Sequence, residues 1–269
     1  MKKVKGEVGS LALVFLLLIL VGLLPPDTSL SEVKKMGVLK VCVPTTYPPL
    51  ITGDPDNPGI DVEILRVVAD FINVKLLLIP IDAMGRDFNP QHWNITRGNC
   101  HVLAGGVVDS RLTRSFLDTG PPYAQTGWAI VAPAPLKDIN GLKIGALTII
   151  SGLDRIGLAR YLGLNDVNVG IVRSVKEMSD GIKNGEFDGG VTEMLLAGGI
   201  ARDNVWWVSS LPDSLARYNL VFGLWKGDLT LKRTIYQVFR NLESDGKLQT
   251  ILQQYGAEKL GLGSQIPTL

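Results

Sequence analysis

The chain has 269 residues, 46% of them hydrophobic, and its 27 lysines and arginines nearly balance its 26 aspartates and glutamates. This length is enough for two modest domains or one large domain. Without residues 1–28 the acidic and basic residues are equal in number. This balance argues against nucleic acid or an anionic membrane surface as the main partner.

The N-terminal segment, residues 1–28, has the pattern of an export signal. Three lysines precede an uncharged apolar run at residues 11–24, which Pro25 and Pro26 end. The run is typical of a signal peptide and is short for a membrane-spanning helix. Because no clear cleavage site follows it, two interpretations stay open, a cleaved signal peptide and an uncleaved N-terminal anchor. Both place the rest of the chain in the periplasm or another extracytoplasmic space.

The next part of the chain alternates between strand and helix patterns. We expect strands at residues 39–43, 75–81 and 100–104, and a helix at residues 60–71 that Asp61 caps. A strand, helix, strand order of this kind indicates a parallel α/β layer.

After Tyr123 the pattern begins again and predicts a second α/β unit. One expected helix ends at about Leu162. A second follows Ser174, its N-cap, and ends at about Asn184. Two apolar faces near the C-terminus, separated by Gly246, predict two final helices. The expected strands lie at residues 128–132, 143–147, 167–172, 187–191, 206–209 and 220–224.

The final helices need a partner sheet, so the second unit is interpreted as an insertion into the first. Lobe 1 is predicted to comprise residues 37–122 and 220–260, and lobe 2 residues 127–217, with residues 261–269 as a tail. Two segments, near residues 122–127 and 216–222, would cross between the lobes. The carboxyl ends of the strands would then face a cleft, where open α/β sheets bind ligands.

The two cysteines, Cys42 and Cys100, fall in strands predicted to be neighbours. An exported protein can pair its cysteines. However, Cys42 lies late in its strand and Cys100 at the start of its own, an offset of about 10 Å. Because that offset is too large for a disulfide, we expect two free, buried thiols.

Six short fragments, in order and at suitable spacing, carry a family resemblance. They are residues 39–50 with Tyr47-Pro48-Pro49-Leu50, residues 59–65, residues 110–123 with Ser110-Arg111 and Pro122-Tyr123, residues 188–193, residues 218–228 and residues 245–248. Together they resemble the bacterial extracellular solute-binding proteins of the polar amino-acid type, which serve ABC importers. The resemblance implies an α/β, two-lobe periplasmic-binding-protein fold of type II. Each lobe would be a mostly parallel sheet flanked by helices, with two crossing segments.

The resemblance also points to a residue for an anion. Residues 110–123 look like a Ser-Arg-Thr-x-x-Arg…Pro-Tyr motif that is one residue short. The second arginine of that motif grips the ligand's carboxylate in the family, which implies this role for Arg114. A guanidinium near a helix start suits a carboxylate. Arg111 is the rival, since the missing residue leaves the register open.

Further ligand contacts are implied at the strand ends. Glu193, where the family usually has aspartate, would accept the ligand's ammonium, and Tyr47 would pack against the ligand. Gly105 and Val107 would offer backbone groups, although Val107 lacks the hydroxyl that the family often has there.

One more implied contact lies in lobe 2. Ser151 and Gly152 stand where the family has Gly-Thr at a helix start, and would offer a hydroxyl and N–H groups.

We therefore predict a monomeric, non-enzymatic protein that closes its lobes on an amino acid or related zwitterion and then docks on an ABC permease. We expect no cofactor, no metal and no nucleic acid. Two alternatives stay open: a ligand-sensing or accessory module not tied to an importer, and an enzyme like cyclohexadienyl dehydratase. In the enzyme, Glu193 would be the acid that protonates a leaving hydroxyl.

Overall fold

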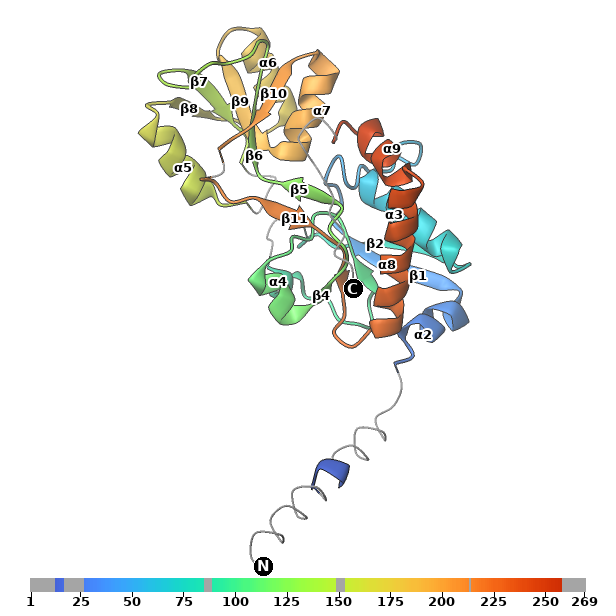
Figure 1. Cartoon of the computed structure of the whole chain (residues 1–269). Coiled ribbons are helices and arrows are strands. Elements are labelled where there is room, and N and C mark those ends of the chain that lie inside the picture. Colours follow the sequence, from blue (N-terminus) through green and yellow to red (C-terminus); the bar gives the residue numbers. More distant parts are fainter. Residues whose placement is uncertain (1–12, 17–26, 85–88, 149–152, 213, 258–269) are drawn as a thin grey trace, which may run out of the picture.

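The computed structural model describes residues 13–16, 27–84, 89–148, 153–212 and 214–257. Most of the predicted export segment 1–28 and all of the predicted tail 261–269 lie outside these residues. Among the described helices, none combines the length and the apolar character that crossing a membrane requires. Two five-stranded sheets, each flanked by helices, form the two lobes, and a two-stranded ribbon lies between them (Figure 1).

Lobe 1 is built on a mixed sheet with the strand order β2-β1-β3-β12-β4. β1 pairs in parallel with both β2 and β3, while β12 runs antiparallel to β3 and β4. The strands are β1 (Val38–Val43), β2 (Lys75–Pro80), β3 (Val102–Leu103), β4 (Asp118–Thr119) and β12 (Gly223–Leu224). The helices are α2 (Ser29–Met36), α3 (Ile60–Phe71), η1 (Pro90–Trp93), α4 (Arg111–Phe116), α8 (Leu229–Ser244) and α9 (Lys247–Gln254).

Lobe 2 repeats this plan with the strand order β10-β6-β9-β7-β8. β7 is parallel to β8 and β9, and β6 is antiparallel to β9 and β10. The strands are β6 (Trp128–Ala132), β7 (Lys143–Ala146), β8 (Asn168–Ile171), β9 (Gly189–Glu193) and β10 (Trp207–Ser210). The helices are α5 (Arg155–Leu164), α6 (Val175–Lys183) and α7 (Met194–Asn204).

The chain crosses between the lobes twice, as the sequence predicted. The crossings contain β5 (Ala124–Thr126) and β11 (Tyr218–Leu220), which pair with each other antiparallel. The segment predicted as one strand at residues 220–224 is divided, because β11 belongs to this ribbon and β12 to the lobe 1 sheet. The two-lobe fold class is thereby confirmed.

The start of α3 differs from the prediction. Gly59 is the N-cap, at a φ of 108° that favours glycine, and a Cβ there would collide with the carbonyl oxygen of Leu50. The first N–H groups of the helix are satisfied by the preceding loop instead: Ile60 donates to the Pro49 carbonyl and Asp61 to that of Leu50. Asp61 therefore does not cap the helix, and its carboxylate is free to face inward.

One hydrophobic cluster extends from lobe 1 into lobe 2. The cluster that fills lobe 1 between the sheet, α3 and α8 also includes Met194, Leu195 and Ala197 of α7, and Ala129 of β6. Leu195 and Ala197 are almost fully buried. Because α7 belongs to lobe 2, this packing brings its first two turns against lobe 1.

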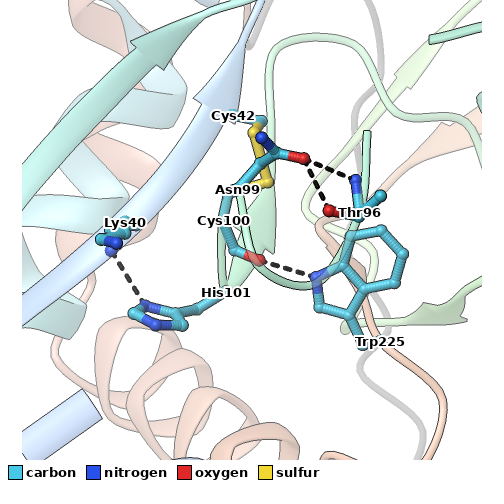
Figure 2. The surroundings of a disulfide bond; sticks show 7 residues. All are labelled: Lys40, Cys42, Thr96, Asn99, Cys100, His101 and Trp225. Atoms are coloured by element: carbon cyan, nitrogen blue, oxygen red, sulfur yellow. Dashed lines mark hydrogen bonds between the residues drawn. A yellow bond between two sulfur atoms is a disulfide. The ribbon is translucent and has the colours of Figure 1, made fainter. Parts of the chain in front are cut away.

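The expectation of two free thiols was wrong, because Cys42 and Cys100 form a disulfide (Figure 2). The ladder begins only at Val102, which pairs with Val41, so Cys100 precedes the strand and strand spacing does not apply to it. The turn at residues 96–99 is closed by Asn99, whose carboxamide oxygen accepts from the Thr96 N–H at 2.8 Å. The chain then returns towards β1, and the two cysteine Cα atoms lie 5.6 Å apart, a spacing usual for a disulfide.

Removing this disulfide is expected to destabilise the protein. The cysteines are 58 residues apart, and a closed loop of that length restricts the unfolded chain by about 4 kcal/mol. We expect chemical denaturation to show a loss of this order for the Cys42→Ala/Cys100→Ala variant. Reducing agent should lower the midpoint of the wild type and leave that of the variant unchanged. Two titratable thiols in the untreated, folded protein would contradict the disulfide.

Candidate functional site

Two of the predicted ligand contacts, one from each lobe, meet in the structure. Tyr47 follows β1 in lobe 1 and Glu193 ends β9 in lobe 2. Both line a pocket of about 100 Å³, together with Pro48, Val175 and Leu196. The pocket therefore lies between the lobes at the carboxyl ends of parallel strands, the usual ligand position in open α/β sheets.

Tyr47 is held rigidly at this pocket. Its backbone N–H donates to the Ile51 carbonyl at 2.7 Å, which closes a tight loop, and its side chain is only 6% exposed. A Cβ at Gly106 would lie 3.2 Å from the Tyr47 ring, so the backbone packs closely against that ring. Burial, and then the nearby Glu193 carboxylate, raise the pKa of Tyr47 well above its usual range. The phenol therefore stays neutral.

The Glu193 carboxylate is buried and accepts three hydrogen bonds from neighbouring groups. It is the N-cap of α7: its Oε1 accepts from the Leu195 N–H at 3.0 Å and its Oε2 from the Leu196 N–H at 2.9 Å. The Thr126 hydroxyl also donates to Oε1. Burial raises the pKa of Glu193, although these three donors oppose the shift. Glu193 is thus a helix cap whose carboxylate also borders the pocket.

Gly105 and Val107 lie away from the pocket between the lobes. The Gly105 N–H donates to Oδ2 of Asp61 at 2.6 Å, so it points into lobe 1. The side chain of Val107 is buried in a second lobe 1 cluster around the disulfide, and its carbonyl accepts from the Val221 N–H. Neither residue lines the pocket between the lobes.

Asp61 organises this strand end, a role that the sequence did not reveal. Its Oδ1 accepts from the Tyr123 hydroxyl at 2.5 Å, and Tyr123 lies next to the first crossing. Asp61 is fully buried, and burial raises the pKa of its carboxyl to about 7 although both hydrogen bonds oppose the shift. The sequence pattern could not separate this inward carboxylate from a helix cap, because both occur in the first turn.

Arg114 lies in α4 and is engaged elsewhere. Its Nε donates to Oδ1 of Asp109 at 2.6 Å and its Nη2 to Oδ2 at 2.5 Å, a bidentate pair. Its side chain is 64% exposed, and the hydrogen bond that it donates to Asp109 raises the pKa of Arg114 above its usual value. The structure does not bring Arg114 into the pocket with Tyr47 and Glu193, and Arg111 is exposed on the same helix. The predicted contacts Ser151 and Gly152 lie outside the described residues.

A larger groove adjoins the pocket and was missed by the sequence. It has a volume of about 340 Å³ and shares Pro48, Val175 and Leu196 with the pocket. Its lobe 1 wall comes from the loop at residues 48–57 with Tyr255, and its lobe 2 wall from α7, including Gly199 and Arg202, with Val175 of α6. The groove arises where α7 packs on lobe 1, a contact that no local pattern predicts.

A separate polar cavity of about 430 Å³ lies on lobe 1, away from the pocket between the lobes. Its charged lining residues are Glu32, Lys40, Arg97 and Asp228, with His101 beside them. Nη2 of Arg97 lies 2.8 Å from Oδ1 of Asp228, so the buried carboxylate already has an ion-pair partner. Nδ1 of His101 accepts from the Lys40 N–H (Figure 2), in keeping with a structural histidine. Among the described residues, no group of acidic, histidine and cysteine side chains is arranged to hold a metal ion.

Comparison with known proteins identifies the family. Residues 39–258 match the bacterial extracellular solute-binding proteins, family 3. The chain therefore belongs to this family, and the predicted resemblance is confirmed.

Solved structures agree on the fold. An ancestral cationic amino acid solute-binding protein superposes with a TM-score of 0.68 at 17% identity, over 85% of this chain and 99% of that one. An ABC uptake transporter substrate-binding protein from Streptococcus pneumoniae, with bound histidine, gives 0.60 at 20% identity, over 85% and 96%. At these identities the likeness shows the fold alone.

The curated relatives that match this chain are of another kind. Membrane-bound lytic murein transglycosylase F of Yersinia pestis (strain Pestoides F) is 28% identical over 174 residues, which are 60% of this chain and 34% of the relative. The chain thus spans about a third of the length of the curated relatives it matches.

The raised pKa of Asp61 predicts a pH-dependent stability. The folded state keeps this proton up to about pH 7, whereas an unfolded aspartate loses it near its usual 3.8. The free energy of unfolding should therefore fall as the pH rises from about 4 to about 7, at up to about 1.4 kcal/mol per pH unit. Urea denaturation across this range should show a flatter profile for Asp61→Asn than for the wild type.

The matched control is Asp70→Asn, at an exposed position of the same helix. Its profile should follow that of the wild type. An unchanged slope in Asp61→Asn would show that Asp61 does not carry the buried proton.

Proposed function

We propose that this protein is an extracytoplasmic solute-binding protein that captures a small zwitterion, an amino acid or a relative of one, between its lobes for ABC-type import. The observation that carries the proposal is the pocket that Tyr47 of lobe 1 and Glu193 of lobe 2 line together, with the groove beside it. A space bounded by both lobes binds its ligand more tightly as they close, which is how two-lobe binding proteins work.

The disulfide supports a position outside the cytoplasm. Disulfides persist in oxidising compartments and are rare in the cytosol, and both cysteines are fully buried. The predicted export segment fits the same location. In this setting a closed, monomeric, ligand-loaded form would dock on a membrane permease.

The ligand roles predicted from the sequence differ in what each requires. Tyr47 needs no rearrangement to contact a ligand, because its buried ring already borders the pocket. Glu193 would have to accept an ammonium in addition to its three present donors. Arg114 can take a carboxylate only if the ligand replaces Asp109, which holds both sides of the guanidinium. Gly105, Val107, Ser151 and Gly152 complete the proposed set.

A sensing or accessory module not tied to an importer is the second candidate. The match of this chain to about a third of the membrane-bound lytic murein transglycosylases F does not favour it, because that name describes an enzyme and not a sensor. Ligand capture between the lobes is common to both candidates. An enzymatic role is supported less, since Glu193, the acid proposed for it, already serves as a helix cap.

Filling the groove should abolish binding without harming the fold. A Cβ at Gly199 would meet nothing within 4 Å, and a side chain in place of glycine also favours the helix. We expect a Gly199→Phe variant to melt no lower than the wild type and to bind no ligand. In a thermal-shift screen of amino acids, small carboxylates and amines, a ligand at 100 times its Kd should raise the wild-type Tm by roughly 5–10 °C.

Gly163→Phe is the matched control. Gly163 lies in an exposed helix of lobe 2 and also has open space around its Cβ, but it does not line the groove. This variant should respond to ligand as the wild type does. Ligand shifts that persist in Gly199→Phe would place the binding site elsewhere.

A further inference from the structure

The space between the lobes is apolar at one end and charged at the other. The inner end is the pocket formed by Tyr47, Pro48, Val175 and Leu196, with Glu193, the cap of α7. The groove then runs along α7, where residues spaced by three or four positions share one face. Leu196, where the groove meets the pocket, lies six positions before Arg202, about 9 Å along the helix axis. A ligand lying along this face would therefore meet different chemistry at its two ends.

Arg202 is the basic side chain at the outer end. Among the described residues that line the groove it is the one cation, with Asp54 and Asp203 as acids nearby. Its Nη1 donates to the Gln254 carbonyl at 3.1 Å, and its Nε to Oδ1 of Asp203 at 3.2 Å. The guanidinium of a lobe 2 residue thus reaches the chain end of lobe 1. Its side chain is 47% exposed, and within the described part of the chain Nη2 donates no hydrogen bond.

The polar groups around Arg202 also present donors. The Tyr255 oxygen accepts from the Gly59 N–H at 3.0 Å, which leaves the phenol's own hydrogen for another acceptor. Oδ1 of Asn57 accepts from Nε2 of Gln254 at 3.3 Å, which leaves the Asn57 amide hydrogens. Tyr255 and Asn57 both line the groove. A site whose acceptors are already occupied and whose donors are still available suits an anion.

Arg114 offers a weaker anion site. Asp109 already makes the bidentate contact that a ligand carboxylate would make, so a ligand must first break it. Arg114 lines neither the pocket nor the groove. Arg202 needs no such exchange, because its contact with Gln254 uses a neutral carbonyl and leaves its charge available.

We propose that the ligand's carboxylate is bound at the outer end of the groove by Arg202, with Tyr255 and Asn57, and that its apolar end enters the pocket at Tyr47 and Leu196. The ligand class is a small carboxylate with an apolar end, such as an aliphatic or aromatic amino acid. Its ammonium then meets Asp54 at the outer end and does not reach Glu193. This inference rests on the proposed function and changes which arginine carries the charge.

Isothermal titration calorimetry on the purified protein tests this placement. The probes are L-leucine, L-methionine and L-phenylalanine, each beside its carboxamide, which lacks the anion, and the remaining common amino acids. We expect at least one apolar amino acid to bind the wild type and its carboxamide to bind far more weakly. Arg202→Ala should weaken that binding roughly 10- to 100-fold, the effect of losing a charge-assisted hydrogen bond.

Two further variants make the result specific. Arg202→Gln keeps a donor for the Gln254 carbonyl and removes the charge, so it carries the test if Arg202→Ala does not fold. Arg160→Ala removes an exposed arginine of the same lobe outside the groove and should bind as the wild type does.

The outcomes separate the inference from the proposed function. If a ligand binds and Arg114→Ala weakens it as much as or more than Arg202→Ala, the inference is overturned and the proposed function stands. The same holds if the ligands that bind keep their affinity in both Arg202 variants. If no amino acid binds the wild type, the proposed function fails and the inference fails with it.

Discussion

The buried carboxylate of Asp61 connects the parts of lobe 1 that shape the space between the lobes. It lies in the first turn of α3, accepts from the Gly105 N–H at the end of β3, and accepts from the Tyr123 hydroxyl beside the first crossing. A helix, a strand end and a crossing segment thus converge on two oxygens. A fully buried carboxylate is stable only with such partners, so these three parts are held in one arrangement. The loop that carries Tyr47 is fixed to the start of the same helix, since the carbonyls of Pro49 and Leu50 accept hydrogen bonds from the first N–H groups of α3.

In lobe 2, the helix α7 connects the parts that shape the space between the lobes. Glu193 caps its N-terminus, and its first turns are buried in the cluster that extends from lobe 1 into lobe 2. It also forms a wall of the groove. One helix therefore both joins the lobes through its packed residues and lines the groove between them. Cap, core contact and groove are linked, because any movement of α7 changes all three.

Electrostatics decides how the two arginines differ. Both are about half exposed or more and both are near an aspartate. Asp109 holds Arg114 by two short contacts, which neutralise its charge and occupy both sides of its guanidinium. Asp203 makes a single, longer contact with Arg202, which also reaches a neutral carbonyl. A ligand carboxylate at Arg114 would thus have to displace the Asp109 carboxylate. At Arg202 it could bind a guanidinium that has donors left over.

The sequence by itself determined the features that depend on neighbours along the chain. Hydrophobic periodicity located the helix at Ile60–Phe71, and Ser174 was identified as an N-cap from its position before an amphipathic run. The order of short motifs indicated the family and the two crossings. These signals survive because caps, breaks and amphipathic spacing act over a few residues.

Only the tertiary structure decided the features that depend on residues distant in the chain. The disulfide was excluded on strand spacing, yet Cys100 precedes its strand, where a turn brings it back to Cys42. Asp61 had the sequence position of a cap, and its role was settled by Gly105 and Tyr123, which come from other elements. Arg202 drew no attention in the sequence, because its significance comes from the lobe 1 residues that α7 packs against. The chemistry of the groove is thus set by contacts between two lobes, which no local pattern encodes.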